Sequence, residues 1–254
     1  MPLTGKYSNW LEIDRGAIEA NVRQCLERTG VQVMAVVKAN GYGHGIVPVA
    51  RAAVRGGATW CGVARVEEAI ELRRAGLDAP ILVLGATPAG RVQEAIGERV
   101  SMAVWDVEHV EAAAAATNGT NERARLHLKV ETGMGRLGIE PGEAAALAQR
   151  IASTPGVILE GVFTHFARAD EADPAPTEAQ ERQFAQVLAA LQAAGLRPGV
   201  VHAANSAASL TRPSAHFNLV RVGIAIYGLN PSPDCPLPDG FRPALSWKAQ
   251  LTQV

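Results

Sequence analysis

The feature that most constrains the fold is a regular alternation of short apolar runs with longer amphipathic segments. Eight apolar runs lie at residues 33–37, 60–63, 81–84, 101–104, 126–130, 161–163, 200–201 and 219–222. Runs that are apolar throughout are typical of parallel strands buried on both faces. Between them, residues 66–75, 143–152 and 178–194 show the helical spacing of apolar and charged side chains.

Eight strand-then-helix units in one chain predict an α/β fold of the (β/α)8 TIM barrel type. The length of 254 residues suits one such barrel, and the 48% of hydrophobic residues can fill its core. A doubly wound open sheet is the alternative that the same alternation allows. Because the active sites of barrels lie at the carboxyl ends of the strands, functional side chains are expected directly after the apolar runs.

Composition and charge argue against several classes of function. The net charge of −1 predicts neither a nucleic-acid partner nor an acidic membrane surface. The three cysteines are widely spaced without a CxxC pattern, so neither a disulfide framework nor a metal site is expected. Residues 1–9 lack the apolar segment of a signal peptide, and no run approaches the roughly 18 apolar residues of a membrane helix. These features predict a soluble, cytoplasmic enzyme.

The predicted domain boundaries follow the ends of the alternating pattern. Residues 1–9 are predicted to be an N-terminal tail and residues 10–229 the barrel, with a mobile surface loop at the acidic, proline-rich residues 168–177. Residues 230–243 are also rich in proline and predict a linker. Apolar residues alternate with period two from 245 to 254, as in a half-buried strand. Because no partner strand is left for it, residues 230–254 are predicted to begin a C-terminal β domain that this sequence truncates.

Lys38 is the leading candidate for covalent chemistry. It follows the first apolar run, so its stem would lie in the core and its amine at the barrel mouth. Partial desolvation there would favour the neutral amine that imine formation needs. The alternative is a lysine that merely extends its amine to solvent from a strand end. Gly41, Gly43 and Gly45 favour the functional interpretation, because they allow close backbone approach just after the lysine.

A phosphate site is predicted after the last two barrel strands. Barrels commonly bind phosphate with these loops. Asn205 and Ser206 follow the seventh run, and Ser206 offers a hydroxyl. Gly223 and Ile224 follow the eighth run and offer backbone N–H groups, beside the fixed cation of Arg221. Each residue alone fits an ordinary turn or surface position, but their joint placement on adjacent strand ends favours a phosphate site.

Three further residues extend the candidate site. Arg136 lies beyond a glycine-rich turn after the fifth run, where it could bind a carboxylate bidentately. Lys129 lies within that apolar run, where a charged amine is costly unless it is paired or modified. His165 follows the sixth run and could pack on a planar ring, although a lone histidine at a strand end is more often structural.

Three motifs in this chain resemble those of the alanine racemases, which are fold-type III pyridoxal phosphate enzymes. They are AVVKANGYGHG at residues 35–45, TGMGRLG at 132–138 and RVGIAIYG at 221–228. The resemblance runs from about Trp10 to the end of the sequence and concerns the N-terminal barrel of that family. It implies pyridoxal 5′-phosphate as the cofactor. It implies the interconversion of L- and D-alanine for peptidoglycan precursors as the reaction.

The resemblance also implies individual roles. Lys38 would carry the cofactor as a Schiff base and act as one of two racemisation bases. The phosphate would be bound by Tyr42, Ser206, Gly223 and Ile224. Arg221 would face the pyridine nitrogen, supported by His165 and His202, with His165 beside the ring and Asn205 close to the cofactor. Arg136 would contact the phenolic oxygen and the substrate carboxylate. Lys129 matches a lysine that is carbamylated in some members, which would convert a buried cation into an anion paired with Arg136.

One departure from the family limits these implications. The second base of the family is a tyrosine from the C-terminal β domain, donated across the interface of a homodimer, and Tyr227 belongs to the barrel motif and cannot replace it. The chain is therefore expected to racemise alanine weakly or not at all. Two other readings stay open: a barrel that binds the cofactor for homeostasis without turnover, and a racemase of another amino acid. A decarboxylase of the same fold fits less well, because the motif after its lysine differs.

Overall fold

The computed structural model describes residues 8–251, and its centre is an eight-stranded parallel barrel. The barrel strands are β2 (Gln32–Val36), β3 (Trp60–Val63), β4 (Ile81–Val83), β5 (Ser101–Val104), β6 (Ala124–Lys129), β7 (Val157–Phe163), β8 (Val200–His202) and β9 (Leu219–Val222). The pairing order runs β8-β7-β6-β5-β4-β3-β2-β9. Two backbone hydrogen bonds link its ends, from Asn218 N to Val201 O at 3.4 Å and from Arg221 N to Ala204 O at 2.9 Å. The predicted barrel is therefore confirmed, and the open-sheet alternative is wrong.

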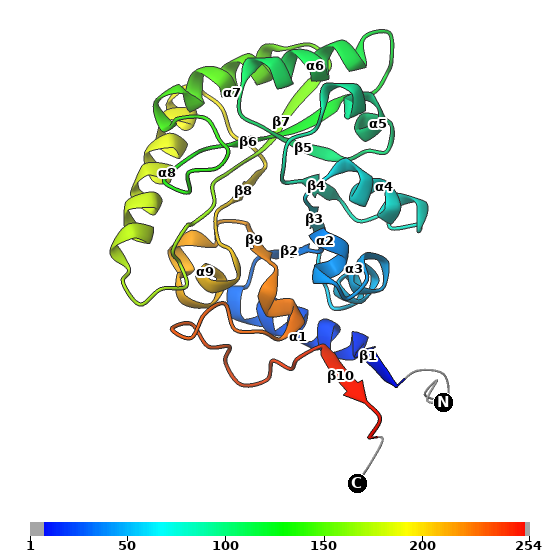
Figure 1. The fold of residues 1–254 in the computed structure, drawn as a ribbon. Helices are drawn as coiled ribbons and strands as arrows, with labels where there is room; N and C mark the ends of the chain where they lie inside the picture. The colour runs from blue at the N-terminus through cyan, green and yellow to red at the C-terminus, as the bar shows by residue number, and fades with distance from the viewer. Residues whose placement is uncertain (1–7, 252–254) are drawn as a thin grey trace.

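Helices surround the strands (Figure 1). The α-helices are α1 (Arg15–Thr29), α2 (Lys38–Tyr42), α3 (Ile46–Arg55), α4 (Val66–Arg74), α5 (Val92–Gly97), α6 (Val107–Thr117), α7 (Ala144–Ser153), α8 (Ala175–Ala193) and α9 (Ser206–Thr211). Short 3₁₀ turns lie at η1 (Ala89–Arg91), η2 (Pro141–Glu143), η3 (Pro213–Ala215) and η4 (Ile224–Tyr227). Side-chain caps set some of the boundaries: Asp14 accepts a hydrogen bond from Ala17 N at the start of α1, and Asp106 accepts one from His109 N at the start of α6.

The core has two parts. Between sheet and helices it is built from small and branched apolar side chains, mostly Ala, Val, Ile and Leu. Inside the barrel, Met34, Trp60, Leu82 and Leu219 form a separate cluster. The three cysteines are buried free thiols, as the sequence predicts. None of the helices in residues 8–251 is long and apolar enough to cross a membrane, and these residues hold no cluster of three metal-ligating side chains.

Two boundaries of barrel elements differ from the sequence prediction by three residues or more. Strand β7 begins at Val157, four residues before the predicted run, because the charged Glu160 interrupts the apolar pattern that defined that run. Helix α8 begins at Ala175, so the last three residues of the predicted loop at 168–177 form its first turn. Asp173 accepts a hydrogen bond from Ala175 N, at 3.0 Å, and so supports that start.

The C-terminal strand does have a partner, contrary to the prediction. Strand β10 (Leu245–Ala249) pairs antiparallel with β1 (Asn9–Ile13), with Leu11 opposite Trp247, and the ribbon lies outside the ring of helices (Figure 1). The prediction assumed that a partner strand would follow residue 254, whereas the partner is β1, near the start of the sequence. The prediction that this strand is half-buried is also wrong for its described residues, since Trp247 is 77% and Leu251 76% exposed. Residues 1–7 of the predicted tail and 252–254 of the predicted strand lie outside the described residues.

Candidate active site

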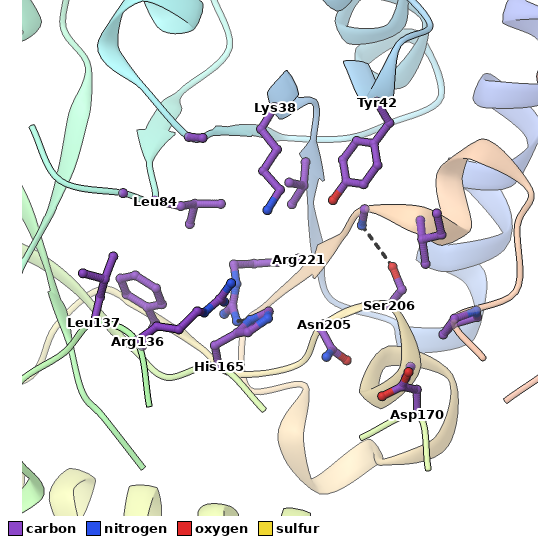
Figure 2. A pocket seen from close by; sticks show the side chains of 18 of the residues that line it. Lys38, Tyr42, Leu84, Arg136, Leu137, His165, Asp170, Asn205, Ser206 and Arg221 are labelled. Atoms are coloured by element: carbon purple, nitrogen blue, oxygen red, sulfur yellow. Dashed lines mark hydrogen bonds between the residues drawn. The ribbon is translucent and has the colours of Figure 1, made fainter. Parts of the chain in front are cut away.

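A cavity of about 600 Å³ is lined by residues that follow seven of the barrel strands. This volume is typical of a small-molecule site. It brings together ten of the eleven residues that the sequence singled out: Lys38, Tyr42, Lys129, Arg136, His165, Asn205, Ser206, Arg221, Gly223 and Ile224. The eleventh, His202, lies behind Arg221 and contacts it. Figure 2 shows Lys38, His165 and Arg221 facing one space.

The cavity also contains residues that the sequence analysis did not identify. Leu84, Leu137 and Phe163 supply apolar wall, and Asp170 adds a carboxylate. Asp170 belongs to the acidic loop after β7, which we expected only to be a surface loop. Ser232, in the predicted linker, donates a hydrogen bond to the backbone carbonyl of Asp170 and ties the two segments together. No local sequence signal separates Asp170 from the other acidic residues of its loop, because its position depends on this long-range contact.

Lys38 begins a turn of left-handed backbone directly after β2. Ala39, Asn40 and Tyr42 have φ values of 52°, 53° and 53°, and Gly41 and Gly43 continue the turn. For a residue other than glycine this conformation costs about 1–2 kcal/mol. Hydrogen bonds offset that cost: the Ala39 N–H donates to Glu68 at 2.6 Å, and Asn40 accepts from Ile46 N at 3.0 Å. The turn brings Lys38 and Tyr42 to the same cavity, a result that the glycines alone did not predict.

The neighbouring wall, formed after β8 and β9, is a cradle of one hydroxyl and two backbone N–H groups. Ser206 Oγ lies 3.0 Å from Gly223 N and 3.3 Å from Ala225 N. A Cβ atom at Gly223 would lie 2.7 Å from the Tyr42 hydroxyl oxygen, so a side chain here would require Tyr42 to move. Asn205 caps α9 by accepting a hydrogen bond from Ala208 N at 3.0 Å. A hydroxyl group and backbone N–H groups that lie this close together form a site suited to binding a phosphate.

Arg221 is held rigidly between the cradle and the barrel interior. Its NH2 group lies within hydrogen-bond distance of Thr164 O at 2.8 Å and Ala203 O at 2.9 Å, and 3.1 Å from His165 Nδ1. Its NH1 group lies 2.9 Å from His202 Nδ1. The guanidinium is only 3% exposed, and burial lowers the pKa of Arg221. A buried cation held by carbonyl oxygens and neutral imidazoles has a fixed direction in the cavity.

His165 is neutral in this setting. Burial lowers the pKa of His165 well below its usual range, and the nearby charges of Arg221, Arg136, Lys129 and Lys38 lower it further. A neutral imidazole with Nδ1 accepting from Arg221 presents a polarised flat ring to the cavity. This arrangement suits stacking against a planar ligand rather than proton transfer.

Lys129 and Arg136 approach the cavity from the end of β6 and the turn that follows it. Burial first, and then the charges of Arg136 and Arg221, lower the pKa of Lys129 to about 8. Glu131 accepts hydrogen bonds from the backbone N–H groups of Gly133 at 2.6 Å and Arg136 at 3.2 Å, and so shapes the turn that carries Arg136. The cluster leaves Lys129 partly unprotonated near neutral pH.

The charges around the cavity indicate an anionic ligand. Lys38, Lys129, Arg136 and Arg221 line it, against the carboxylate of Asp170. Pyridoxal phosphate fits this donor set: an amine, a phosphate cradle, a cation opposite a ring position, and flat faces from His165 and Phe163. The fit rests on the chemistry of these groups and on the tight Gly223–Tyr42 approach.

Comparisons with known proteins agree with this geometry. Residues 13–231 match the family model described as alanine racemase, N-terminal domain. The chain belongs to this family. The barrel that the sequence motifs predicted is thereby confirmed as the alanine racemase N-terminal domain.

Individual relatives show how far the similarity extends. The chain is 46% identical to the alanine racemase of Symbiobacterium thermophilum, covering 100% of this chain and 68% of that protein. It is 48% identical to that of Thermobifida fusca, covering 94% of this chain and 65% of that protein. The chain thus spans about two thirds of the length of these relatives.

Solved structures give the same result. An alanine racemase of Clostridium difficile 630 in complex with cycloserine superposes with a TM-score of 0.91 at 33% identity, over 96% of this chain and 68% of that one. The alanine racemase of Bacillus anthracis with bound L-Ala-P superposes with a TM-score of 0.89 at 42% identity, over 94% and 63%. These relatives support a racemase.

Proposed function

We propose that this chain is the cofactor-binding barrel of a pyridoxal phosphate-dependent alanine racemase that supplies D-alanine for peptidoglycan precursors in the cytoplasm. The observation that carries the proposal is the convergence of the Lys38 amine, the Ser206–Gly223 cradle and the Arg221 guanidinium on one cavity. The named relatives and the printed title with bound L-Ala-P support alanine as the substrate. When bound, pyridoxal phosphate would withdraw electrons from the substrate and so acidify its α-proton.

The residues of this chain then divide the work of binding and proton transfer. Lys38 would hold the cofactor covalently and, once displaced by substrate, take and return the α-proton on one face. Tyr42, Ser206, Gly223 and Ile224 would bind the phosphate, with Asn205 beside them, and Arg221 would face the pyridine nitrogen with His165 and His202 behind it. Arg136 would bind the substrate carboxylate bidentately.

Racemisation needs a second base on the opposite face, and Tyr227 does not provide it. Tyr227 is 1% exposed, donates its hydroxyl to Val36 O at 3.2 Å, and has its pKa raised by burial. The Tyr42 hydroxyl is committed to the cradle beside Gly223. We therefore propose that the second base is a tyrosine outside the described residues, contributed by the partner in a homodimer, as the resemblance implies.

The first test is spectroscopic. With added pyridoxal phosphate, the chain should turn yellow and show an imine absorption band. The band should be absent in Lys38→Ala and present in a Lys248→Ala control, whose lysine lies on the exposed ribbon. An unchanged spectrum in Lys38→Ala would refute the assignment of Lys38.

The second test separates racemase from cofactor carrier. Incubation with alanine in D₂O should place deuterium at Cα of one enantiomer faster than the configuration inverts, because Lys38 serves one face only. Cofactor binding without any exchange would instead favour the homeostasis-type protein. Full racemase activity from residues 1–254 would contradict the need for a second base elsewhere.

A further inference from the structure

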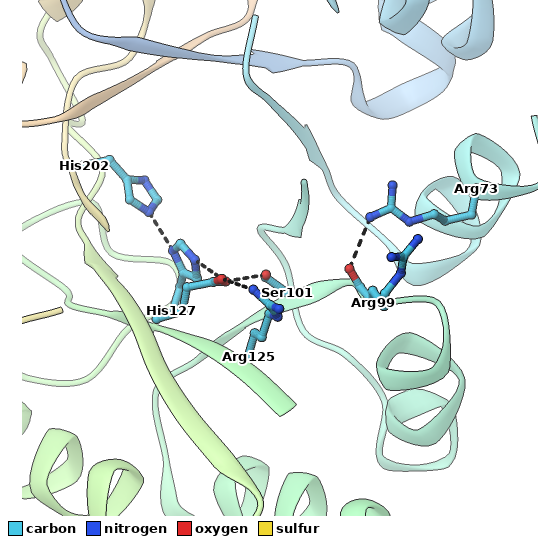
Figure 3. Close-up of polar contacts among 7 residues, drawn as sticks. Arg73, Arg99, Ser101, Arg125, His127 and His202 are labelled. Atoms are coloured by element: carbon cyan, nitrogen blue, oxygen red, sulfur yellow. Dashed lines mark hydrogen bonds and ion pairs between the residues drawn. The ribbon is translucent and has the colours of Figure 1, made fainter. Parts of the chain in front are cut away.

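A line of polar side chains runs through the barrel interior behind Arg221. Arg221 NH1 lies 2.9 Å from His202 Nδ1, and His202 Nε2 lies 3.0 Å from His127 Nδ1. His127 Nε2 lies 3.1 Å from a carboxylate oxygen of Glu160. Both imidazoles are 0% exposed, and Figure 3 shows His202 and His127 linked in this line. Only Arg221 among these four residues lines the cavity, so the proposed reaction does not use the other three directly.

The fold makes room for the far end of this line. Pairing between β6 and β7 shifts register at Leu126/His127, so that Glu160 is an extra residue in β7 and forms a β-bulge. The next residue is Gly161, where a Cβ atom would lie 2.4 Å from His127 Nδ1. A bulge re-aims the side chain that it carries. The bulge and the glycine together bring the Glu160 carboxylate against the buried imidazole.

Glu160 is a carboxylate and accepts every hydrogen bond that it makes here. It accepts from Ser101 Oγ at 2.5 Å and from Arg125 NH1 at 3.1 Å, in addition to His127. Burial by itself raises the pKa of Glu160, but the hydrogen bonds from His127 and Ser101 outweigh burial and bring that pKa to about 2. At neutral pH the far end of the line is therefore an anion.

The two ends fix the direction of every hydrogen bond between them. A guanidinium can only donate, and a carboxylate can only accept. His202 Nδ1 must therefore accept from Arg221, which leaves the proton of neutral His202 on Nε2, facing His127 Nδ1. His127 Nδ1 accepts in turn, so its proton lies on Nε2 and is donated to Glu160. Both imidazoles are neutral Nε2–H tautomers, ordered between a buried cation and an anion.

Aromatic contacts hold the rings in this order. Phe163 stacks on His202 with centroids 4.6 Å apart and planes 6° apart, and the Arg221 guanidinium carbon lies 5.3 Å from the centre of the same phenyl ring. Trp60 packs edge-on against His127 at 5.5 Å. Each imidazole ring is thus held in one orientation, and only the position of its N–H proton can still vary.

We propose that Glu160 and His127 are positioning residues that lock His202 in its Nε2–H tautomer and thereby hold the Arg221 guanidinium in place. The consequence of this tautomer lock for the cofactor rests on the proposed function, since Arg221 faces the pyridine nitrogen only if pyridoxal phosphate binds. The carboxylate at the far end also balances a buried cation that has no carboxylate among the hydrogen-bond partners of its own NH1 and NH2 groups.

Removal of the Glu160 carboxylate should weaken the hydrogen bond between Arg221 and His202, although three hydrogen bonds separate Glu160 from Arg221. In Glu160→Leu, the His127 Nε2–H group loses its acceptor, so the interaction that favours the Nε2–H tautomer is lost and the Nδ1–H tautomer becomes populated. That tautomer places two N–H groups face to face between His127 and His202. His202 relieves the clash by moving its own proton to Nδ1, at the cost of the hydrogen bond that Arg221 NH1 donates to it.

The experiment is ¹⁵N NMR of the imidazoles in the chain without pyridoxal phosphate, with His127 and His202 assigned from single His→Gln spectra. Wild type should show one Nε2–H tautomer at both rings. Glu160→Gln, whose amide oxygen can still accept from His127, should keep this tautomer, whereas Glu160→Leu, which offers no acceptor, should populate the Nδ1–H tautomer at both. Hydrogen exchange of the Arg221 guanidinium should become about tenfold faster, as expected when one buried hydrogen bond is lost.

The matched control is Glu19→Gln, which removes a partly buried carboxylate that pairs with Arg55 but has no imidazole partner. It should leave both tautomers unchanged. If His127 and His202 keep their wild-type tautomer in Glu160→Leu, the proposal is overturned; should Glu160→Leu not fold, Glu160→Ala takes its place. Because no cofactor is present, the result does not depend on the proposed function, which the spectroscopic test with Lys38→Ala addresses separately.

Discussion

At the residue scale, Lys129 is the clearest case of a side chain whose charge is opposed by its surroundings. It is 5% exposed and lies near the charges of Arg136, Arg221 and Lys38, against the single nearby carboxylate of Glu131. Its pKa of about 8 lies below the ordinary lysine value of 10.5. Only the neutral amine can react with carbon dioxide, so this setting supports the proposal that Lys129 is carbamylated.

The Lys129 amine should make stability depend on pH in a predictable direction. Between pH 8 and 10.5 the unfolded state binds this proton and the folded state does not, so stability attributable to Lys129 rises with pH over that range. In CO₂-free buffer, the difference in urea midpoint between wild type and Lys129→Met should therefore shift in favour of wild type from pH 8 to 10.5. A constant difference would contradict the lowered pKa.

Carbamylation itself predicts a second effect at this residue. Bicarbonate should raise the melting temperature of wild type, because a carbamate places an anion among three cations, and should leave Lys129→Met unchanged.

At the element scale, α2 is a short turn that the barrel forces into an unfavourable conformation. Strand β2 delivers Lys38 to the cavity, and the left-handed backbone that follows returns the chain to α3 within a few residues. Glu68 on α4 accepts from the backbone N–H of Ala39, Ala64 and Arg65, and so ties the ends of β2 and β3 to one carboxylate. The strain is local, and tertiary hydrogen bonds maintain it.

Ala39→Gly should therefore test the strain in α2. Ala39 is exposed and has φ 52°, so glycine removes the cost of the left-handed conformation, and we expect stability to rise by about 0.5–1 kcal/mol after the greater chain entropy of glycine is deducted. The matched control is Ala115→Gly at an exposed position of α6, where the same exchange should cost about 1 kcal/mol. Urea unfolding measures both, and equal losses would contradict the strain.

At the scale of the whole molecule, the first and last strands of the described residues, β1 and β10, meet on one side of the barrel. Asn21 on α1 is fully buried and links η4 to the segment before β10: its amide donates to Ile226 O at 3.0 Å and Arg242 O at 2.8 Å and accepts from Arg242 N at 2.9 Å. Asp14 N donates to Ala244 O at 2.7 Å beside the ribbon. The Asn21 side chain therefore connects the first helix, η4 and the segment before β10.

Loss of the Asn21 amide should destabilise the whole chain. Asn21→Leu leaves the buried carbonyl of Ile226 and partly buried backbone groups of Arg242 without the Asn21 amide, and we expect a loss of about 2–4 kcal/mol in the free energy of unfolding. Asn218→Leu removes an amide at the surface, bonded to Gly199 O and Val201 N, and should cost about 1 kcal/mol. Similar losses in both variants would show that Asn21 does not link these segments.

The sequence by itself determined the repeating unit and ten of the residues that line the cavity. Each barrel strand is a local apolar run, and the alternation of such runs with amphipathic segments can be recognised without a structure. Lys38, Ser206, Gly223 and Arg221 were recognisable because strand ends of a barrel meet at one mouth, so that position along the chain implies position in space.

Only the tertiary structure decided what depends on distant parts of the chain. The pairing of β1 with β10, the placement of Asp170, the left-handed α2 and the line from Glu160 to Arg221 each require partners far away in sequence. In the sequence, Glu160 interrupts the apolar pattern of its strand. In the structure, it occupies a β-bulge and faces His127 on the neighbouring strand β6. Register and closure of the barrel fix such contacts, and neither is encoded in the spacing of neighbouring residues.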